Sequence, residues 1–178
     1  MALAAAIYIL ATLLANYTAM WFVPLPVFGM VAVGTLVFGI TFTQRDRLHH
    51  HGRRTVYTVI ALAALANSLE SVLLDIPPRI ILASFTAIVL AELADTEVYQ
   101  RHVRRPWLGR VAISNAVSIP LDSLLFNLIA FAGVFEPAML IAIVLGEIVV
   151  KTLVGGVTAL WRDRSWSTVK LATAGWLK

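Results

Sequence analysis

The chain has 178 residues, of which 60% are hydrophobic and only 13% are charged. Disordered chains have low hydrophobicity, and soluble domains have about 45–50% apolar and about 25% charged residues. The composition therefore predicts an integral membrane protein, with room for six spanning helices of about 20 residues each. There is no cysteine, which excludes disulfides and thiol chemistry.

Six apolar stretches follow one another along the chain, and none shows the period-two alternation of a membrane β-strand. They predict an all-α fold in which residues 1–161 form one transmembrane domain and residues 162–178 form a basic cytoplasmic tail that suits the membrane interface. The six expected spans are 2–21, 24–43, 55–74, 79–99, 107–132 and 137–161.

Basic residues are distributed unevenly between the two sides of this arrangement. Twelve of the 14 Lys and Arg residues fall after the second span, around the start of the fifth, or in the tail. Arg79 alone falls on the opposite side, and Lys151 lies inside the sixth span. Because positive loops stay in the cytoplasm, both termini are expected to be cytoplasmic in a multi-pass protein.

Several ionisable residues fall inside the expected spans. A charge at the centre of a membrane helix costs roughly 2.5–3.5 kcal/mol, so these groups must pair, protonate or face a polar cavity. The sequence favours a solute or ion pathway over purely structural buried pairs. The residues concerned are Glu70, Glu92, Asp122, Glu147 and Lys151.

The sixth span carries Glu147 and Lys151 one helical turn apart, so the two side chains share a face. The pair is interpreted either as a self-neutralising pair or as part of a binding site. On the fifth span, Asn115, Asp122 and Phe126 lie on one stripe. Because the proline at position 120 has no N–H, a backbone carbonyl beside this stripe is left without its helical partner.

The remaining charged positions are predicted to act in gating or coupling. Glu92 and Asp95 share a stripe near the cytoplasmic side, where the alternative is pairing with the arginine-rich loops. Glu70 lies nearer the outer face. Arg45 and Asp46 stand at the cytoplasmic boundary, so we expect a gate or folding element there and no substrate contact.

The second span carries Thr35, Phe38 and Phe42 on one stripe, beside Gly34 and Gly39. Small residues allow close helix packing, so this stripe is interpreted as a packing surface or as the wall of a binding site.

No catalytic motif and no nucleotide-binding motif is found in the sequence. The chain is therefore not expected to be an enzyme, or to need a cofactor, a metal or nucleic acid. The histidine run 49–51 is expected to be a solvated linker, because no metal-ligand spacing accompanies it.

Five stretches together resemble the VUT family, also called the queuosine-precursor transporter family. They are ANY at 15–17, AVGTLVFGITFTQRD at 32–46, SN at 114–115, PLDSLLF at 120–126 and GEIVVK at 146–151. The resemblance implies six membrane helices in a prokaryotic cytoplasmic (inner) membrane. It also implies uptake of 7-deazaguanine bases, in the nitrile or the aminomethyl form, and adds Asn16 to the candidate binding residues.

The candidate residues are chemically compatible with such a base. A carboxylate of Asp122 or Glu147 would accept hydrogen bonds from the ring N–H and the exocyclic amine together. Lys151 or Asn115 would donate to the carbonyl oxygen. The flat rings would pack on aromatic walls, for which the candidates are Phe38, Phe42 and Phe126.

Two other functions remain open at this stage. One is a proton-coupled carrier or channel for another small solute or nucleobase, and the other is a non-transport scaffold subunit whose buried charges contact partner proteins. Gly155 and Gly156, like the alanine-rich stretch 55–74, suit helix contacts within one subunit or between the subunits of a homo-oligomer.

Overall fold

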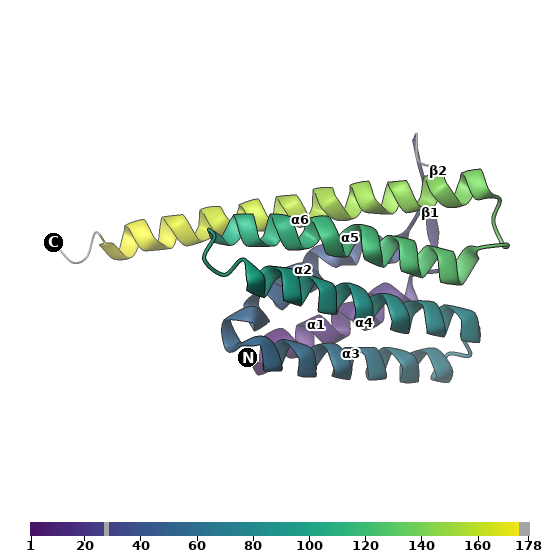
Figure 1. Ribbon diagram of the computed structural model, residues 1–178, viewed down its shortest axis with the longest axis horizontal. Helices are drawn as coiled ribbons and strands as arrows, with labels where there is room; N and C mark the ends of the chain where they lie inside the picture. The colour runs from purple at the N-terminus through teal and green to yellow at the C-terminus, as the bar shows by residue number, and fades with distance from the viewer. Residues whose placement is uncertain (27–28, 175–178) are drawn as a thin grey trace.

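The computed structural model describes the backbone of residues 1–26 and 29–174 and the side chains of residues 1–26 and 30–161. It is a bundle of long helices with one small β-hairpin (Figure 1). In chain order the elements are α1 (Ala2–Tyr17), β1 (Phe22–Leu25), β2 (Gly29–Ala32), the 3-10 helix η1 (Val33–Val37), α2 (Phe38–Leu48), the 3-10 helix η2 (His49–His51), α3 (Arg53–Leu73), α4 (Pro78–Arg101), α5 (Trp107–Phe131) and α6 (Pro137–Ala174). The expected location of the tail in the membrane interface concerns side chains outside the described residues.

The helices run up and down along a common long axis, joined by short loops (Figure 1). One end of the bundle, here called the basic end, carries the N-terminus, the α2–α3 and α4–α5 connections and the emerging continuation of α6. Its exposed arginines are Arg47, Arg53, Arg54, Arg101, Arg104 and Arg105. The opposite end, here called the hairpin end, carries β1, β2 and the α3–α4 and α5–α6 connections.

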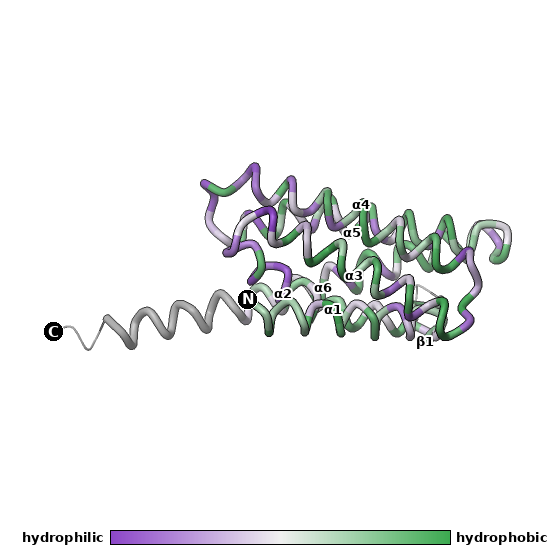
Figure 2. The backbone as a smooth tube through the Cα atoms, turned by 90° about the horizontal axis from the view of Figure 1, so that it is seen from below, coloured by the Kyte–Doolittle hydropathy of each residue, from purple (hydrophilic) through white to green (hydrophobic). Residues whose placement is uncertain are grey.

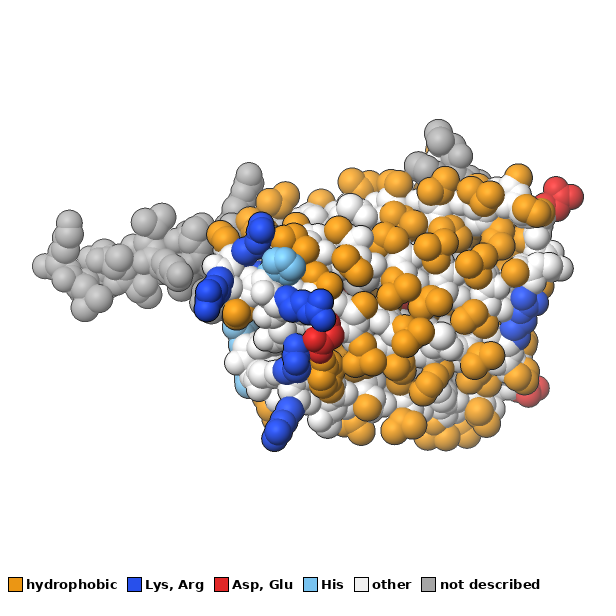
Figure 3. Space-filling view, viewed as in Figure 1, with side chains coloured by type: hydrophobic (Ala, Val, Ile, Leu, Met, Phe, Trp, Pro, Cys, Tyr) orange, Lys and Arg blue, Asp and Glu red, His pale blue; other side chains and the backbone are white. Residues whose placement is uncertain are grey.

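Apolar side chains cover the face of the bundle shown in Figure 3, between its two ends. The helix middles are largely hydrophobic, whereas hydrophilic positions gather at the connections, most densely at the basic end (Figure 2). Leucines such as Leu65, Leu82 and Leu153 are exposed on this surface, and an apolar surface this large is unfavourable in water. The surface is that of a protein embedded in lipid.

Three of the described helices are long and apolar enough to cross a membrane, namely α3, α5 and the Pro137–Trp161 part of α6. α1 is apolar but shorter, with 16 residues. α4 is long, but it carries Glu92, Asp95 and Glu97 within a few turns. The structure is that of an all-α membrane protein, apart from the hairpin, and three of the six expected spans meet this criterion.

The expected single helix over 24–43 is wrong. Residues 22–32 form an antiparallel hairpin in which Phe22 pairs with Ala32, and α2 begins only at Phe38. Pro24 and Pro26 explain the difference, because proline lacks an N–H and pushes the residue before it out of helical conformation. The chain therefore returns from the hairpin end to the basic end through β2, η1 and α2, a segment here called the broken segment.

Glycines let the broken segment pack closely against its neighbours. A Cβ on Gly34 would lie 2.2 Å from the Ala15 carbonyl oxygen of α1, and one on Gly39 would lie 2.6 Å from Val154 of α6. Gly155 of α6 makes room in turn for the Phe42 ring. The expected close approach at Gly34 and Gly39 is confirmed, and the Gly155 contact falls within one subunit.

α4 and α5 are tied together at the hairpin end and again near the middle of α5. At the hairpin end, the Arg79 guanidinium donates hydrogen bonds to the carbonyl oxygens of Ile129 and Ala132 at the end of α5. Toward the basic end, Ser118 Oγ donates to Asp95 Oδ1 at 2.9 Å. These two helices therefore form a cross-braced pair.

Candidate functional site

A cavity with an empty volume of about 660 Å³, part of it open to solvent, lies inside the bundle. α1, the broken segment, α4, α5 and α6 all contribute to its walls. The lining residues are Tyr8, Thr12, Ala15, Asn16, Ala19, Ala32, Gly34, Thr35, Phe38, Thr41, Ser84, Ala87, Ile88, Glu92, Asp122, Phe126, Glu147 and Lys151. Because Ala19 and Ala32 adjoin the hairpin, the cavity extends from the middle of the bundle toward the hairpin end.

The structure brings most of the candidate binding residues together at this cavity. Those that line it are Asn16, Thr35, Phe38, Asp122, Phe126, Glu147 and Lys151. Phe42 instead lines a smaller neighbouring cavity of about 200 Å³ together with Arg45 and Ser118. Asn115 lines neither cavity, because its side-chain oxygen accepts a hydrogen bond from Arg45. The Thr35, Phe38 and Phe42 stripe thus contributes to cavity walls, while the glycines beside it provide the packing.

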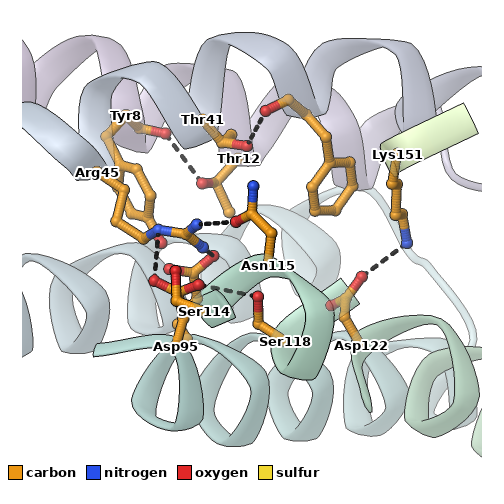
Figure 4. A network of polar contacts seen from close by, with 12 residues as sticks. Tyr8, Thr12, Thr41, Arg45, Asp95, Ser114, Asn115, Ser118, Asp122 and Lys151 are labelled. Atoms are coloured by element: carbon orange, nitrogen blue, oxygen red, sulfur yellow. Dashed lines mark hydrogen bonds and ion pairs between the residues drawn. The ribbon is translucent and has the colours of Figure 1, made fainter. Parts of the chain in front are cut away.

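Lys151 stands at the centre of a buried ionic cluster between α5 and α6 (Figure 4). Its Nζ lies 2.7 Å from Asp122 Oδ2 and 3.1 Å from Glu147 Oε2. It also donates to Ser123 Oγ at 3.0 Å, and it lies 4.5 Å from the centre of the Phe38 ring. The Glu147–Lys151 pair expected from helical spacing is formed, with Asp122 as a second acid.

These contacts change the expected role of Lys151. An ammonium group has three N–H donors, and Asp122, Glu147 and Ser123 accept all three. The structure therefore leaves Lys151 without a donor for a ligand carbonyl. The Asn115 amide, the other expected donor, lies outside the cavity lining.

Arg45 organises a second ionic cluster, closer to the basic end (Figure 4). Its Nη1 lies 3.1 Å from Glu92 Oε1, and its Nε lies 3.1 Å from Asp95 Oδ2. Its Nη2 donates to Asn115 Oδ1 at 2.9 Å, and its guanidinium carbon lies 4.9 Å from the centre of the Phe42 ring. The side chain is 1% exposed, so the Arg45 cluster is buried inside the bundle.

His49 extends the Arg45 cluster outward. Its Nε2 lies 3.8 Å from Asp95 Oδ2, and its ring stacks on Tyr99 with centroids 4.0 Å apart. Burial holds the pKa of His49 below its ordinary value, and repulsion from Arg45 lowers it further, against the opposing effect of Asp95. The expectation of a solvated histidine run is therefore wrong for His49, although the other two histidines are exposed.

Two of the gating candidates, Asp46 and Glu70, lie outside the lining of both cavities. Asp46 is buried next to Arg45 near the end of α2. Glu70 is half-buried on α3 near the hairpin end. Glu92 is the candidate that joins the two regions, because it lines both cavities and also pairs with Arg45. No group of three or more His, Asp and Glu side chains suited to a metal occurs in the part of the chain that is described.

Four polar lining residues were not expected from the sequence, namely Tyr8, Thr12, Thr41 and Ser84. Thr12 and Tyr8 come one and two turns before Asn16 on α1, so these three residues form a polar stripe on an otherwise apolar helix. Ser84 donates a 2.6 Å hydrogen bond to Asn16 Oδ1, while Asn16 Nδ2 donates to Ser71. On α1, the four-residue spacing of the polar residues from Tyr8 to Asn16 was the sequence signal for a polar cavity wall. On α4, the eight-residue spacing of Ser84 and Glu92 was the corresponding signal.

Comparison with known proteins gives one family. The sequence model of a family described as "putative vitamin uptake transporter" matches residues 55–161. The match includes Glu92, Asp95, Asp122, Glu147 and Lys151 and excludes Arg45, which lies before it. No curated protein matches the chain, and no solved structure matches it.

Proposed function

The chain belongs to this family of vitamin uptake transporters, and from that premise we propose that it imports 7-deazaguanine bases, the precursors of queuosine, across the cytoplasmic membrane. Membership of the family makes the chain a small-molecule uptake transporter, which is not an enzyme class. The proposed substrate is supported by the cavity, whose polar groups and flat apolar walls suit a deazapurine.

The observation that carries the proposal is the pair of acids at Lys151. Asp122 and Glu147 both line the cavity, and each has one carboxylate oxygen bonded to the ammonium group. The ring N–H and exocyclic amine of a 7-deazaguanine are adjacent donors, which one carboxylate accepts together. Phe38 and Phe126 provide aromatic surface beside these acids.

In the proposed topology all six helical segments cross the inner membrane of a prokaryote, and the basic end faces the cytoplasm. The described arginines at that end support this orientation, because positive loops are retained inside. The broken segment provides the second crossing, and breaks of this kind are common at transporter binding sites. A reporter fused after residue 178 is expected to read as cytoplasmic, and an external reading would overturn the orientation.

The Arg45 cluster is proposed as the cytoplasmic gate. Arg45, Glu92 and Asp95 close the cavity toward the basic end, so a bound molecule cannot pass while their contacts persist. Asp46 and Glu70 are proposed to assist at the two ends of the path. Release into the cytoplasm then requires separation of Arg45 from Glu92 and Asp95.

Uptake of labelled 7-deazaguanine bases tests the proposed function directly. The host should lack its own synthesis of these bases and its own uptake system, and it should carry either this chain or an empty vector. We expect label to enter the tRNA of cells that carry the chain. Normal expression of the chain without uptake of either base would overturn the proposed substrate and favour another small solute.

A further inference from the structure

The charged side chains around the cavity are unbalanced. Those that line it are Glu92, Asp122, Glu147 and Lys151. Arg45 adds one positive charge behind the wall, but its guanidinium is shared between Glu92 and a further acid, Asp95. Four carboxylates therefore share two cations, which leaves a negative excess at the cavity when the acids are ionised.

The hydrogen bonds show the same imbalance. Lys151 uses its three donors on Asp122, Glu147 and Ser123. The Lys151 hydrogen bonds fall on Asp122 Oδ2 and Glu147 Oε2, the second oxygens of both carboxylates are not used by Lys151, and the buried Glu92 Oε2 has no hydrogen-bond partner among the described residues. These carboxylates therefore offer acceptors to a ligand, whereas the ammonium group beside them offers no donor.

The excess negative charge at the cavity favours positively charged ligands over neutral ones. Taking a charge out of water is expensive unless an opposite charge compensates it, so a neutral ligand would leave the excess uncompensated. A ligand ammonium would provide the missing positive charge together with up to three donors. A ligand acceptor in the same place would face carboxylate oxygens and be repelled.

We infer that the cavity selects a flat ligand whose ring bears a positively charged amine, with the ring edge on one carboxylate and the ammonium on another. The inference rests on the proposed function, and among the 7-deazaguanine bases it assigns the aminomethyl form as the preferred substrate. That form presents the ring N–H and exocyclic amine to one acid and an ammonium to a second acid. The nitrile form is neutral, and its nitrile nitrogen is an acceptor.

The test compares uptake of the two labelled bases by one strain that lacks their synthesis and its own transporter. The parent chain is expected to take up the aminomethyl base with a Michaelis constant roughly 10- to 100-fold lower than that for the nitrile base, as for the loss of a hydrogen bond to a charged group. Glu147→Gln removes one negative charge and is expected to reduce this ratio severalfold. Glu136→Gln changes an exposed acid outside the cavity and should leave the ratio unchanged.

The results separate the inference from the function on which it rests. Uptake of the nitrile base with an equal or lower Michaelis constant would overturn the inference and leave the proposed function standing. Uptake of neither base by the expressed parent would overturn both. Because the parent alone answers the question of preference, the inference stays testable even when Glu147→Gln fails to fold.

Discussion

Lys151 Nζ and Asp122 Oδ2 lie 2.7 Å apart, although the two residues are 29 positions apart on different helices. The contact joins α6 to α5 beside the cavity, and Glu147 completes it from one turn away at 3.1 Å. A single ammonium group thus holds two acids in place, so its removal affects both the structure and the site.

Replacement of Lys151 by methionine should destabilise the protein strongly. Breaking a buried ion pair by removing one partner costs about 3–5 kcal/mol, which corresponds to a fall of roughly 6–20 °C in melting temperature for a chain of this size. The measurement is thermal unfolding in detergent. The double variant Lys151→Met, Glu147→Gln should recover part of the loss, since it leaves only one acid unpaired. A single variant as stable as the parent would contradict the structural role of Lys151.

Asp122→Asn and Glu147→Gln each preserve shape and replace one acceptor with a donor. At the carboxylate that binds the ring edge, the mismatch should cost roughly 1–3 kcal/mol, or about 5- to 150-fold in affinity. The measurement is concentration-dependent uptake of a labelled base at matched expression, with Glu136→Gln as the control. Parent-like uptake by both variants would move the binding site toward Glu92, the third acid that lines the cavity.

Arg45→Lys should impair transport while sparing binding. A guanidinium contacts Glu92, Asp95 and Asn115 from a rigid fork, which a single ammonium cannot reproduce. We expect uptake to fall at least about tenfold, while affinity in detergent stays within about threefold of the parent value. The neighbouring exposed Arg47, changed to lysine, is the control. A ligand bonded directly to Arg45 in a complex structure would refute the assignment to the gate.

Gly34→Ala should be poorly tolerated because the new Cβ would meet the backbone of α1 at the Ala15 carbonyl. Overpacking costs typically 1–3 kcal/mol, and a backbone oxygen cannot move aside as a flexible side chain does. Gly156→Ala is the matched control, since nothing lies within 4 Å of a Cβ placed there. The measurements are the yield and the melting temperature of the two purified variants. Equal values for both variants would mean that α1 and η1 do not pack so closely.

His49 should make the stability of the basic end depend on pH. Its pKa is held below the ordinary value of 6.5 in the folded chain, so the unfolded chain binds its proton at higher pH. The stability that this difference provides is present above about pH 6.5 and declines as the pH falls toward the folded-state pKa. Melting temperatures at several pH values test this. His49→Gln should flatten the dependence, whereas His51→Gln, at an exposed position, should not. An equally steep dependence in both variants would exclude His49 as its cause.

Local rules predicted those parts of the site that depend on a single helix. The Glu147–Lys151 pair follows from one helical turn, and the burial cost of charge singled out Asp122 and Glu92 because they fall inside the expected spans. The partner of Asp122 could not be predicted, because it depends on how α5 lies against α6. For the same reason, Asn115 was expected on the cavity wall, whereas the structure pairs it with an arginine from α2.

The hairpin was not predicted, for a different reason. The signal was present in Pro24 and Pro26, but the average hydropathy of the stretch 24–43 hid it. Tyr8 and Thr12 were missed because single hydroxyl groups are unremarkable in an apolar helix, and only their alignment with Asn16 gives them meaning. Arg45 was expected at the cytoplasmic boundary beside solvent, whereas the structure buries it against acids from α4 that no local pattern connects to it.

The contacts between α4 and α5 make these two helices one unit, here called the frame, and the broken segment packs against it. Arg79 joins the two helices at the hairpin end and Ser118 joins them near the middle of α5, so they are expected to shift as a unit. By contrast, the Arg45 side chain holds α2 to this frame through contacts that a change of charge at Glu92 would weaken. Any rocking motion is therefore expected where the broken segment meets α4 and α5, and a crosslink between them at the basic end is expected to arrest it.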